Sequence, residues 1–249
     1  MIALITGGAT GIGYGFARAY ADLGYNLILT SRNIDNLHHA KKEIEEKYNN
    51  KVMVFVCDLT KEEERTALFN YTNNYKIDVF INNAGRGLSE DFLLANFQEE
   101  QNIIDLNVVA FQALFKHYLQ KMNNNNEGRI INVSSVGGFL SGPGSATYYA
   151  SKAYINSLVR AVIYEMRKSN VFIQLVFPGA TKSKFYETAN TKEKSYKYDP
   201  YLVAIKTINS NKKEVIPGFK AKLIVFFNKL LPKKLVIRLT YRRQVKMRS

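Results

Sequence analysis

The chain of 249 residues is 46% hydrophobic and 22% charged, a balance that excludes disordered and collagen-like proteins and suits one large α/β domain. Its single cysteine, Cys57, lies inside the apolar run VMVFVCDL, so no internal disulfide can form. We expect Cys57 to be a core residue of a protein from a reducing compartment. The opening MIALITGG lacks the basic start and long apolar run of a signal peptide, which predicts a cytoplasmic location.

The net charge of +14 is confined to the C-terminal part of the chain. Residues 1–181 hold 17 basic and 17 acidic side chains, whereas residues 182–249 hold 18 basic and 4 acidic ones. A neutral body with a basic C-terminal quarter predicts a contact with an anionic partner through that quarter alone.

Short apolar runs alternate with longer amphipathic stretches along most of the chain. The runs are rich in β-branched residues and bounded by Gly, Asn, Asp or Pro, which predicts buried strands at 2–6, 26–30, 52–56, 79–82, 129–134 and 171–177. Helical patterns lie between them at 12–23, 34–48, 61–75, 97–122 and 148–168. This alternation predicts an α/β fold, a doubly wound parallel sheet with helices on both faces.

Shorter signals complete the expected elements. Thr60 and Glu63 form a capping-box pattern that predicts the start of the third helix. The asparagine run 123–126 indicates a loop, the polar excursion 182–213 shows no clear element, and residues 214–218 suggest a short seventh strand.

The first strand runs into TGGATGIG, whose glycines Gly7, Gly11 and Gly13 open the first helix. A glycine-rich turn at this place lets the backbone approach a pyrophosphate and aims helix N–H groups at it. The spacing is G-x-x-x-G-x-G and no Lys-Ser/Thr pair follows, which disfavours a nucleoside triphosphate P-loop. The turn predicts a dinucleotide site, although a glycine turn also serves purely structural ends.

The second strand ends in Ser31 and Arg32, where a cofactor with a free ribose 2′-hydroxyl would favour an acidic residue. An arginine can form a bidentate pair with a 2′-phosphate, so this end favours NADP(H) over NAD(H). Asp58, at the end of the third strand, is a candidate acceptor for the adenine amino group or a turn residue before Thr60.

Seven markers in order resemble the short-chain dehydrogenase/reductase family from residue 2 to about residue 185. They are TGGATGIG at 6–13, Asp58, NNAG at 82–85, Asn107 in DLNVVA, NVSS at 132–135, the Y-x-x-x-K of Tyr148 and Lys152, and PGATKS at 178–183. One departure is Ser183, where the family often has threonine.

The resemblance implies a Rossmann-type sheet of seven strands and a catalytic set of Asn107, Ser135, Tyr148 and Lys152. It also implies cofactor contacts from both ends of the dinucleotide, by Gly7, Gly11, Ile12, Gly13, Arg32, Asp58, Leu59, Asn83, Ala84, Gly85, Tyr148, Lys152, Pro178, Gly179 and Thr181.

The implied roles have physical reasons. Tyr148 and Lys152 are four residues apart on one helix face, so we expect the ammonium to lower the phenol pKa and make the tyrosine a general acid and base. By family analogy Ser135, and not Ser134, would hydrogen-bond the substrate carbonyl. Asn107 would hold a water that links Lys152 to solvent, while hydride transfer belongs to the nicotinamide.

Neighbouring polar residues are expected to serve packing. Tyr149 points about 100° away from Tyr148, and Tyr154 faces elsewhere. Ser145 and Ser151 are not needed for the chemistry. Other chemistries lack support, because no G-x-S-x-G elbow and no metal-ligand cluster occurs and because His38, His39 and His117 fit solvated or packed positions.

Residues 219–249 predict a pair of basic amphipathic helices that extend the catalytic domain of residues 1–218. An apolar face comes first, a cationic stripe follows beyond Pro232, and the longest apolar run, LIVFF, is far shorter than the ~20 residues of a membrane span. The apolar face consists of Phe219, Leu223, Phe227, Leu230 and Leu231, and the stripe of Lys234, Arg238, Arg242 and Lys246.

Two interpretations of this tail stay open, an anionic membrane surface on the inner side and cover for the substrate pocket or a partner subunit. Only the positive charge of the tail would favour nucleic acid as a partner, since no nucleic-acid-binding motif is present.

We therefore predict an NADP(H)-dependent oxidoreductase that interconverts a carbonyl and a secondary alcohol on a hydrophobic or lipid-like substrate. The tail differs from the family's β-ketoacyl carrier-protein reductases. Sugar, amino-acid or acyl thioester substrates are alternatives, as is a dinucleotide-binding scaffold or sensor. The resemblance also implies a homo-dimer or tetramer formed through 97–122 and 148–168.

Overall fold

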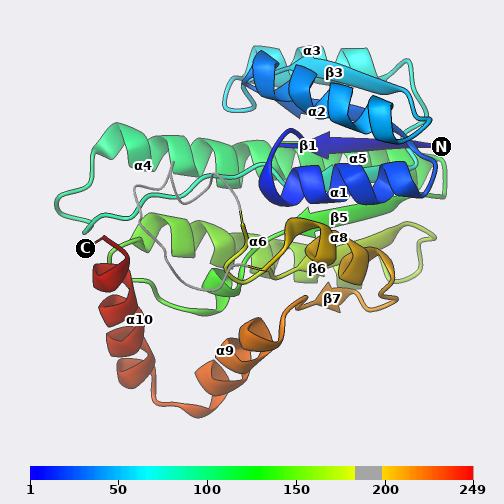
Figure 1. Cartoon of the computed structure of the whole chain (residues 1–249). Coiled ribbons are helices and arrows are strands. Elements are labelled where there is room, and N and C mark those ends of the chain that lie inside the picture. The colour runs from blue at the N-terminus through cyan, green and yellow to red at the C-terminus, as the bar shows by residue number, and fades with distance from the viewer. Residues whose placement is uncertain (183–197, 249) are drawn as a thin grey trace.

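A seven-stranded parallel sheet forms the centre of the computed structural model, which describes residues 1–182 and 198–248 (Figure 1). The strand order is β3-β2-β1-β4-β5-β6-β7. The strands are β1 (Ile2–Thr6), β2 (Asn26–Ser31), β3 (Val52–Val56), β4 (Val79–Asn82), β5 (Arg129–Val133), β6 (Phe172–Val176) and β7 (Glu214–Val215). The six predicted strands and the short seventh are confirmed, and with them the doubly wound fold.

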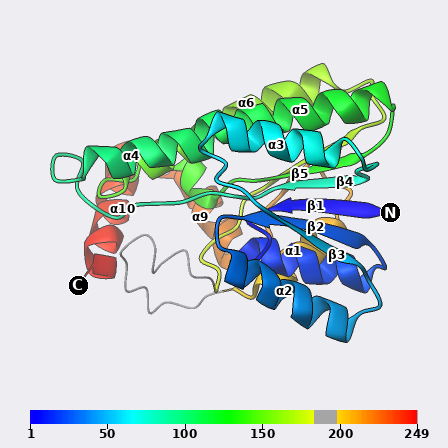
Figure 2. The same ribbon diagram turned by 90° about the horizontal axis from the view of Figure 1, so that it is seen from above.

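Helices cover both faces of the sheet, as Figure 2 shows from above. One face carries α3 (Glu62–Thr72), α4 (Phe97–Ile104), α5 (Phe111–Asn124) and α6 (Ala146–Glu165). The other carries α1 (Gly11–Asp22), α2 (Ile34–Lys47) and α8 (Pro200–Ile208). The C-terminal helices are α9 (Phe219–Leu230) and α10 (Lys233–Arg248), and a 3₁₀ turn, η2, spans Val136–Phe139.

Two hydrophobic clusters, one on each face, hold the layers together. Alternate side chains of β1 enter opposite clusters, with Leu4 on the α5 and α6 side and Ala3 and Ile5 on the α1 and α2 side. Both faces of the sheet are thus buried, which explains the continuous apolar strand sequences. Cys57 is buried in the first cluster, as predicted.

Helix α8 lies within the excursion for which no element was expected. The Asp199 carboxylate caps it by accepting from the Tyr201 and Leu202 amides at 2.7 and 3.3 Å, and Pro200 occupies its first turn. Its first turn packs on α1, where a Cβ at Gly15 would lie 2.4 Å from the Pro200 carbonyl oxygen. The Asp-Pro pair before an apolar stretch is a helix-start signal, but the polar surroundings obscured it.

The predicted capping box of α3 is wrong. The N-cap is Lys61, and the Thr60 hydroxyl donates to Asp58 Oδ1 at 2.8 Å. The Thr60 hydroxyl that would have capped the helix is instead hydrogen-bonded to the Asp58 carboxylate. Three glutamates, Glu62 to Glu64, occupy the first turn instead and favour the positive end of the helix dipole.

The predicted helix 97–122 is interrupted in its middle. Between α4 and α5 the chain forms a π-helix, η1 (Asp105–Ala110), whose wider turn contains Asn107. Single π turns of this kind occur often at functional sites, and sequence periodicity does not reveal them.

The tail folds as two helices joined at Leu231 and Pro232, as predicted. Within the described residues, none of the helices has both the length and the apolar character needed to cross a bilayer.

Candidate active site

The candidate residues gather at the carboxyl ends of the strands. β1 and β4 lie side by side, and their following segments leave toward opposite faces of the sheet (Figures 1 and 2). Ligands of doubly wound sheets bind at such a switch point. The site is built from the loops after β1, β4, β5 and β6 and from the first turns of α6.

The tight turn of the glycine loop requires glycine. Gly7 and Gly11 have φ angles of +63° and +54°, and a Cβ at Gly13 would lie 2.1 Å from the Gly7 carbonyl oxygen. Thr10 begins α1 without a side-chain cap, and the first turn carries no acidic side chain. The first N–H groups of α1, near Ile12, therefore suit the pyrophosphate of an NAD(P) cofactor.

Thr6 ties this loop to the segment after β4. Its hydroxyl oxygen accepts from the amides of Asn83 and Ala84 at 2.9 and 3.0 Å, and Asn83 Nδ2 donates to the Thr6 carbonyl at 2.9 Å. NNAG is thus held against the glycine loop. Thr6 was not predicted as a site residue, because its role depends on a contact between strands 75 residues apart.

Arg32 stands at the end of β2 with a side chain that is 60% exposed, 4.0 Å from Asp58. Burial alone would raise the pKa of Asp58, but two hydrogen bonds from Thr60 and the charge of Arg32 outweigh it, so the pKa lies below its usual value. Asp58 thus serves the turn, one of its two expected roles. Next to it, the carbonyl of buried Leu59 accepts a hydrogen bond from Arg65 Nη1 at 2.8 Å.

Tyr148 lies in the first turn of α6, hydrogen-bonded to Ser135. Ser135 caps the turn η2 by accepting from the Gly137 amide at 3.0 Å, which orients its hydroxyl. Burial raises the pKa of Tyr148 to about 12, against the lowering effect of Ser135, and Tyr149 adds to the rise. The expectation of a lowered phenol pKa is wrong here, because desolvation of the phenolate dominates.

Lys152 is buried one turn further along α6. Its Nζ donates to the Val133 carbonyl at 3.3 Å and lies 5.9 Å from the centre of the Tyr148 ring. Burial lowers the pKa of Lys152 to about 8. The ammonium thus lies on the predicted face, beside the ring of Tyr148.

Asn107 is fully buried in the π turn. Its Nδ2 donates to the Arg86 carbonyl at 2.9 Å and to Ser151 Oγ at 3.0 Å, and its Oδ1 accepts from the Arg86 amide at 3.0 Å. Ser151 in turn donates to the Tyr148 carbonyl at 2.7 Å. Ser151 therefore connects Asn107 to the helix of Tyr148, a positioning role that the sequence did not suggest.

Gly85 leaves a space between Asn107 and Lys152. A Cβ at Gly85 would lie 3.2 Å from Asn107 Oδ1 and 3.3 Å from Lys152 Nζ. The amide oxygen of Asn107 and the ammonium of Lys152 therefore both lie close to Gly85, where no side chain stands between them.

The segment after β6 closes the site on the side of the tail. The Pro178 carbonyl accepts from the Val136 amide at 3.0 Å, and Thr181 donates to the Gly179 carbonyl at 3.0 Å. α9 packs here, since a Cβ at Gly179 would lie 3.3 Å from that of Ala221. Ser183 lies outside the described residues.

The end of the tail also reaches the site. Gln244 of α10 is 4% exposed, and its Nε2 donates to the Tyr149 hydroxyl at 2.8 Å. Tyr149 packs edge-on against Tyr148, with ring centres 5.8 Å apart. The packing role of Tyr149 is confirmed. Its partner Gln244 was not predicted, because only the charged residues of the C-terminal helix were considered.

The histidines are placed as expected. The His117 ring stacks on Phe69 at 3.8 Å, and His39 faces Glu43 on α2. In the described part of the chain, no group of His, Cys, Asp and Glu side chains could hold a metal ion.

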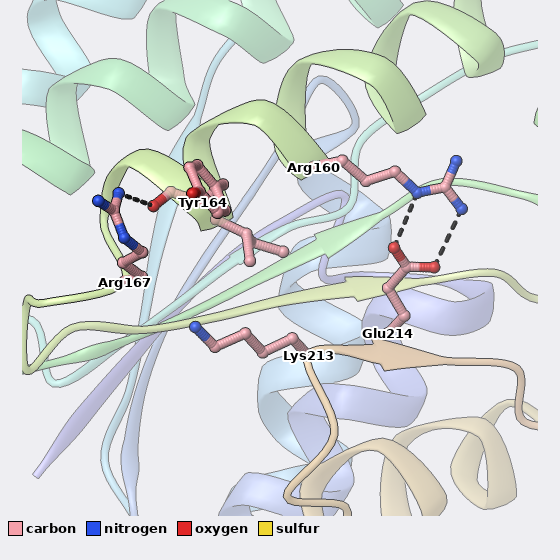
Figure 3. Close-up of a pocket in the computed structure, with 6 residues that line it drawn as sticks. Arg160, Tyr164, Arg167, Lys213 and Glu214 are labelled. Carbon is pink, nitrogen blue, oxygen red and sulfur yellow. Dashed lines mark hydrogen bonds and ion pairs between the residues drawn. The ribbon is translucent and has the colours of Figure 1, made fainter.

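A separate surface pocket lies between the end of α6 and the start of β7, near the amino-terminal end of that strand (Figure 3). Arg160 Nε and Nη2 donate to the two carboxylate oxygens of Glu214 at 2.8 and 3.0 Å. Arg167 donates to the Tyr164 carbonyl at 3.0 Å. These contacts join α6 to β7, so this pocket is a structural seam away from Tyr148.

The comparisons agree with this geometry. A family model described as short chain dehydrogenase matches residues 1–194. The chain is 33% identical over 193 residues to the 3-oxoacyl-(acyl-carrier-protein) reductase FabG of Rickettsia conorii, with 77% of each protein covered.

Solved structures share the fold. A short-chain dehydrogenase from Sphingobium yanoikuyae in complex with NADPH is similar with a TM-score of 0.84 at 24% identity, over 92% of this chain and 93% of that one. A short-chain dehydrogenase/reductase from Burkholderia phymatum in complex with NAD has a TM-score of 0.84 at 20% identity, over 96% and 95%. The chain therefore belongs to the short-chain dehydrogenase/reductase family and is an NAD(P)-dependent oxidoreductase that acts on carbonyl or alcohol groups.

Proposed function

We propose that the chain reduces a carbonyl to a secondary alcohol with NADPH, on a hydrophobic substrate. The observation that carries the proposal is the position of Tyr148, hydrogen-bonded to Ser135 and one helical turn before Lys152, whose ammonium lies close to Gly85 of the NNAG segment. When bound, the nicotinamide supplies the hydride. The chain's own residues orient the carbonyl and move the proton.

Ser135 and Tyr148 act on the substrate oxygen. The Ser135 hydroxyl orients the carbonyl and stabilises the negative charge that develops on its oxygen. Tyr148 then donates its phenolic proton to that oxygen, which completes the alcohol. A pKa of about 12 favours the protonated phenol near neutral pH, the form that reduction requires.

Lys152 and Asn107 resupply the proton. A water held between Asn107 Oδ1 and Lys152 Nζ, beside Gly85, would accept from the ammonium and donate to the amide oxygen. Such a water would connect the buried Lys152 to solvent. Lys152 would pass the proton on toward Tyr148, which is regenerated for the next turnover.

Arg32 supports the preference for NADP(H). It is exposed at the end of β2, and its guanidinium can pair with a 2′-phosphate in two hydrogen bonds. Asp58 lies near enough to hold the guanidinium at this end of the sheet.

The substrate preference rests on the surroundings of the site. The segment between β4 and α4, which follows the NNAG loop, carries three strongly exposed apolar side chains, Phe92, Leu93 and Leu94. Such surfaces favour apolar over sugar-like substrates. An acyl thioester is the second candidate, because the Rickettsia conorii relative is a 3-oxoacyl reductase. In this proposal, residues 1–218 form the catalytic domain and 219–249 extend it.

The test is a panel of carbonyl and alcohol compounds assayed with NADPH and with NADH, following absorbance of the reduced nicotinamide. We expect turnover of apolar ketones with NADPH well above that with NADH. Binding of NADPH without turnover of any compound would favour a dinucleotide-binding scaffold and contradict the proposal.

A further inference from the structure

The tail carries charge of one sign only. Residues 219–249 hold ten lysines and arginines and no acidic residue, whereas residues 1–181 are neutral. A field of this kind attracts an anionic surface and repels a cationic one.

The cations of α10 point away from the body of the protein. Val236, Thr240 and Gln244 recur every four residues and are buried against the body. Each cation of the stripe lies two residues away from one of these buried side chains, which is about 200° around the helix axis. Its members, at the outermost line of α10, are Lys234, Arg238, Arg242 and Lys246.

The outermost line of α9 is apolar. Ala221 and Val225 are buried, and Leu223 and Phe227 follow them by two residues each, so these two side chains point away from the body. Leu230, in the last turn, is 64% exposed. Phe219 at the start of the helix is 75% exposed. The predicted apolar face therefore does not cover the substrate site of its own chain.

A second exposed apolar segment lies beside the end of α10. Leu93 is 93% exposed, and Phe92, Leu94 and Phe97 are also strongly exposed. The segment between β4 and α4 and the end of α10 occupy the same side of the molecule in both views (Figures 1 and 2). Ser89 Oγ donates to Gln244 Oε1 at 3.4 Å, which ties the two together.

We propose that α9, α10 and residues 92–97 form a docking face for an anionic lipid bilayer. Apolar side chains enter the interfacial layer, and the stripe of α10 contacts acidic headgroups. A second copy of the chain fits less well, because a two-fold interface would set this all-cationic surface against itself. A nucleic acid would satisfy the charges but leave the apolar side chains exposed.

The test is co-sedimentation of the intact protein with phosphatidylcholine vesicles that contain about one third phosphatidylserine, without cofactor or substrate. We expect binding that weakens as salt shortens the Debye length from ~30 to ~8 Å. The triple variant Lys234→Glu, Arg238→Glu, Arg242→Glu should lower the partition coefficient on the order of 100-fold. Leu93→Asn with Leu94→Asn should lower it about 10-fold.

A matched control moves the same charge change to the amino-terminal ends of the strands. Lys51→Glu, Lys168→Glu and Lys212→Glu alter three exposed lysines there. This triple should change binding by no more than about twofold, since distant exposed charges are screened. Circular dichroism checks that each variant is folded.

Three results would overturn the inference. They are absence of binding to anionic vesicles at low salt, equal binding to vesicles of phosphatidylcholine alone, and equal losses in the two triple variants. Binding of duplex DNA without vesicle binding would assign the cations to nucleic acid. A change of oligomeric mass in the α10 triple, without vesicle binding, would assign the face to a subunit contact. Because no turnover is measured, the outcome is independent of the proposed reaction.

Discussion

At the scale of single residues, burial acts on Tyr148 and Lys152 in opposite directions. Desolvation favours the neutral form of each, so it raises the pKa of the phenol to about 12 and lowers that of the ammonium to about 8. Near neutral pH both groups are protonated. The pair is thus set for proton donation, which is the direction of carbonyl reduction.

The alkaline limb of the pH profile should report Lys152. We expect kcat/KM for reduction to fall as pH rises through about 8, because the relay loses its proton there. Tyr148 keeps its proton over this range. Initial rates with NADPH, measured from about pH 6 to about pH 10, define this limb of the profile. A flat profile would contradict the assignment of Lys152 to the relay.

Stability should depend on Lys152 with a defined sign. Its folded-state pKa of about 8 lies below the unfolded value of 10.5, so between these values the unfolded chain binds more protons. As pH rises through that window, the free energy of unfolding of the wild type should therefore increase relative to that of Lys152→Met. Below pH 8 we expect Lys152→Met to be more stable by roughly 1–3 kcal/mol, with little activity. Urea unfolding at pH 7 and pH 10, about the two ends of the window, measures the difference.

Cofactor preference should depend on Arg32. Arg32→Asp places a carboxylate where a 2′-phosphate would bind and where a 2′-hydroxyl could donate. We expect KM for NADPH to rise on the order of 10- to 100-fold, with a smaller change for NADH. An unchanged ratio of kcat/KM for the two cofactors would show that the phosphate is recognised elsewhere.

At the scale of elements, the contact between α1 and α8 should reverse the usual effect of helix propensity on stability at Gly15. Replacing an interior helix glycine by alanine usually stabilises a helix by about 1 kcal/mol. At Gly15 the added Cβ would lie 2.4 Å from the Pro200 carbonyl, a backbone atom that cannot move alone. Gly15→Ala should therefore destabilise the protein by roughly 1–3 kcal/mol, as a shifted urea midpoint shows.

Elements were predictable where the local signal and the fold agree. The strands carry continuous apolar runs because both faces of the sheet are buried, and their order along the chain sufficed to predict the parallel topology. α8 and the start of α3 were missed because single hydrogen bonds decide them, from Asp199 and from Thr60 to Asp58. The π turn at Asn107 likewise has no periodicity of its own.

The site was predictable in its residues more than in its connections. Tyr148 and Lys152 lie together because a spacing of four residues places them on one helix face, whereas Ser135 was assigned through the family resemblance. Thr6, Ser151 and Gln244 act across long sequence separations, so no local pattern marks them. The direction of the Tyr148 pKa was wrong because its burial was not visible in the sequence.

At the scale of the whole molecule, charge and chemistry are separated. A neutral body holds the cofactor loop and the candidate catalytic residues, while a basic tail contacts their edge through Ala221 and Gln244. The two proposals, a reductase and a lipid-docking face, are thus separate properties of one fold.

The central claim is that Tyr148 donates the proton in an NADPH-linked reduction. The most direct measurement compares kcat of wild type and Tyr148→Phe on the best ketone of the panel, with NADPH binding followed by fluorescence. We predict a loss of roughly 10²- to 10⁴-fold in kcat with NADPH affinity nearly unchanged. Turnover by Tyr148→Phe at the wild-type rate would contradict the account.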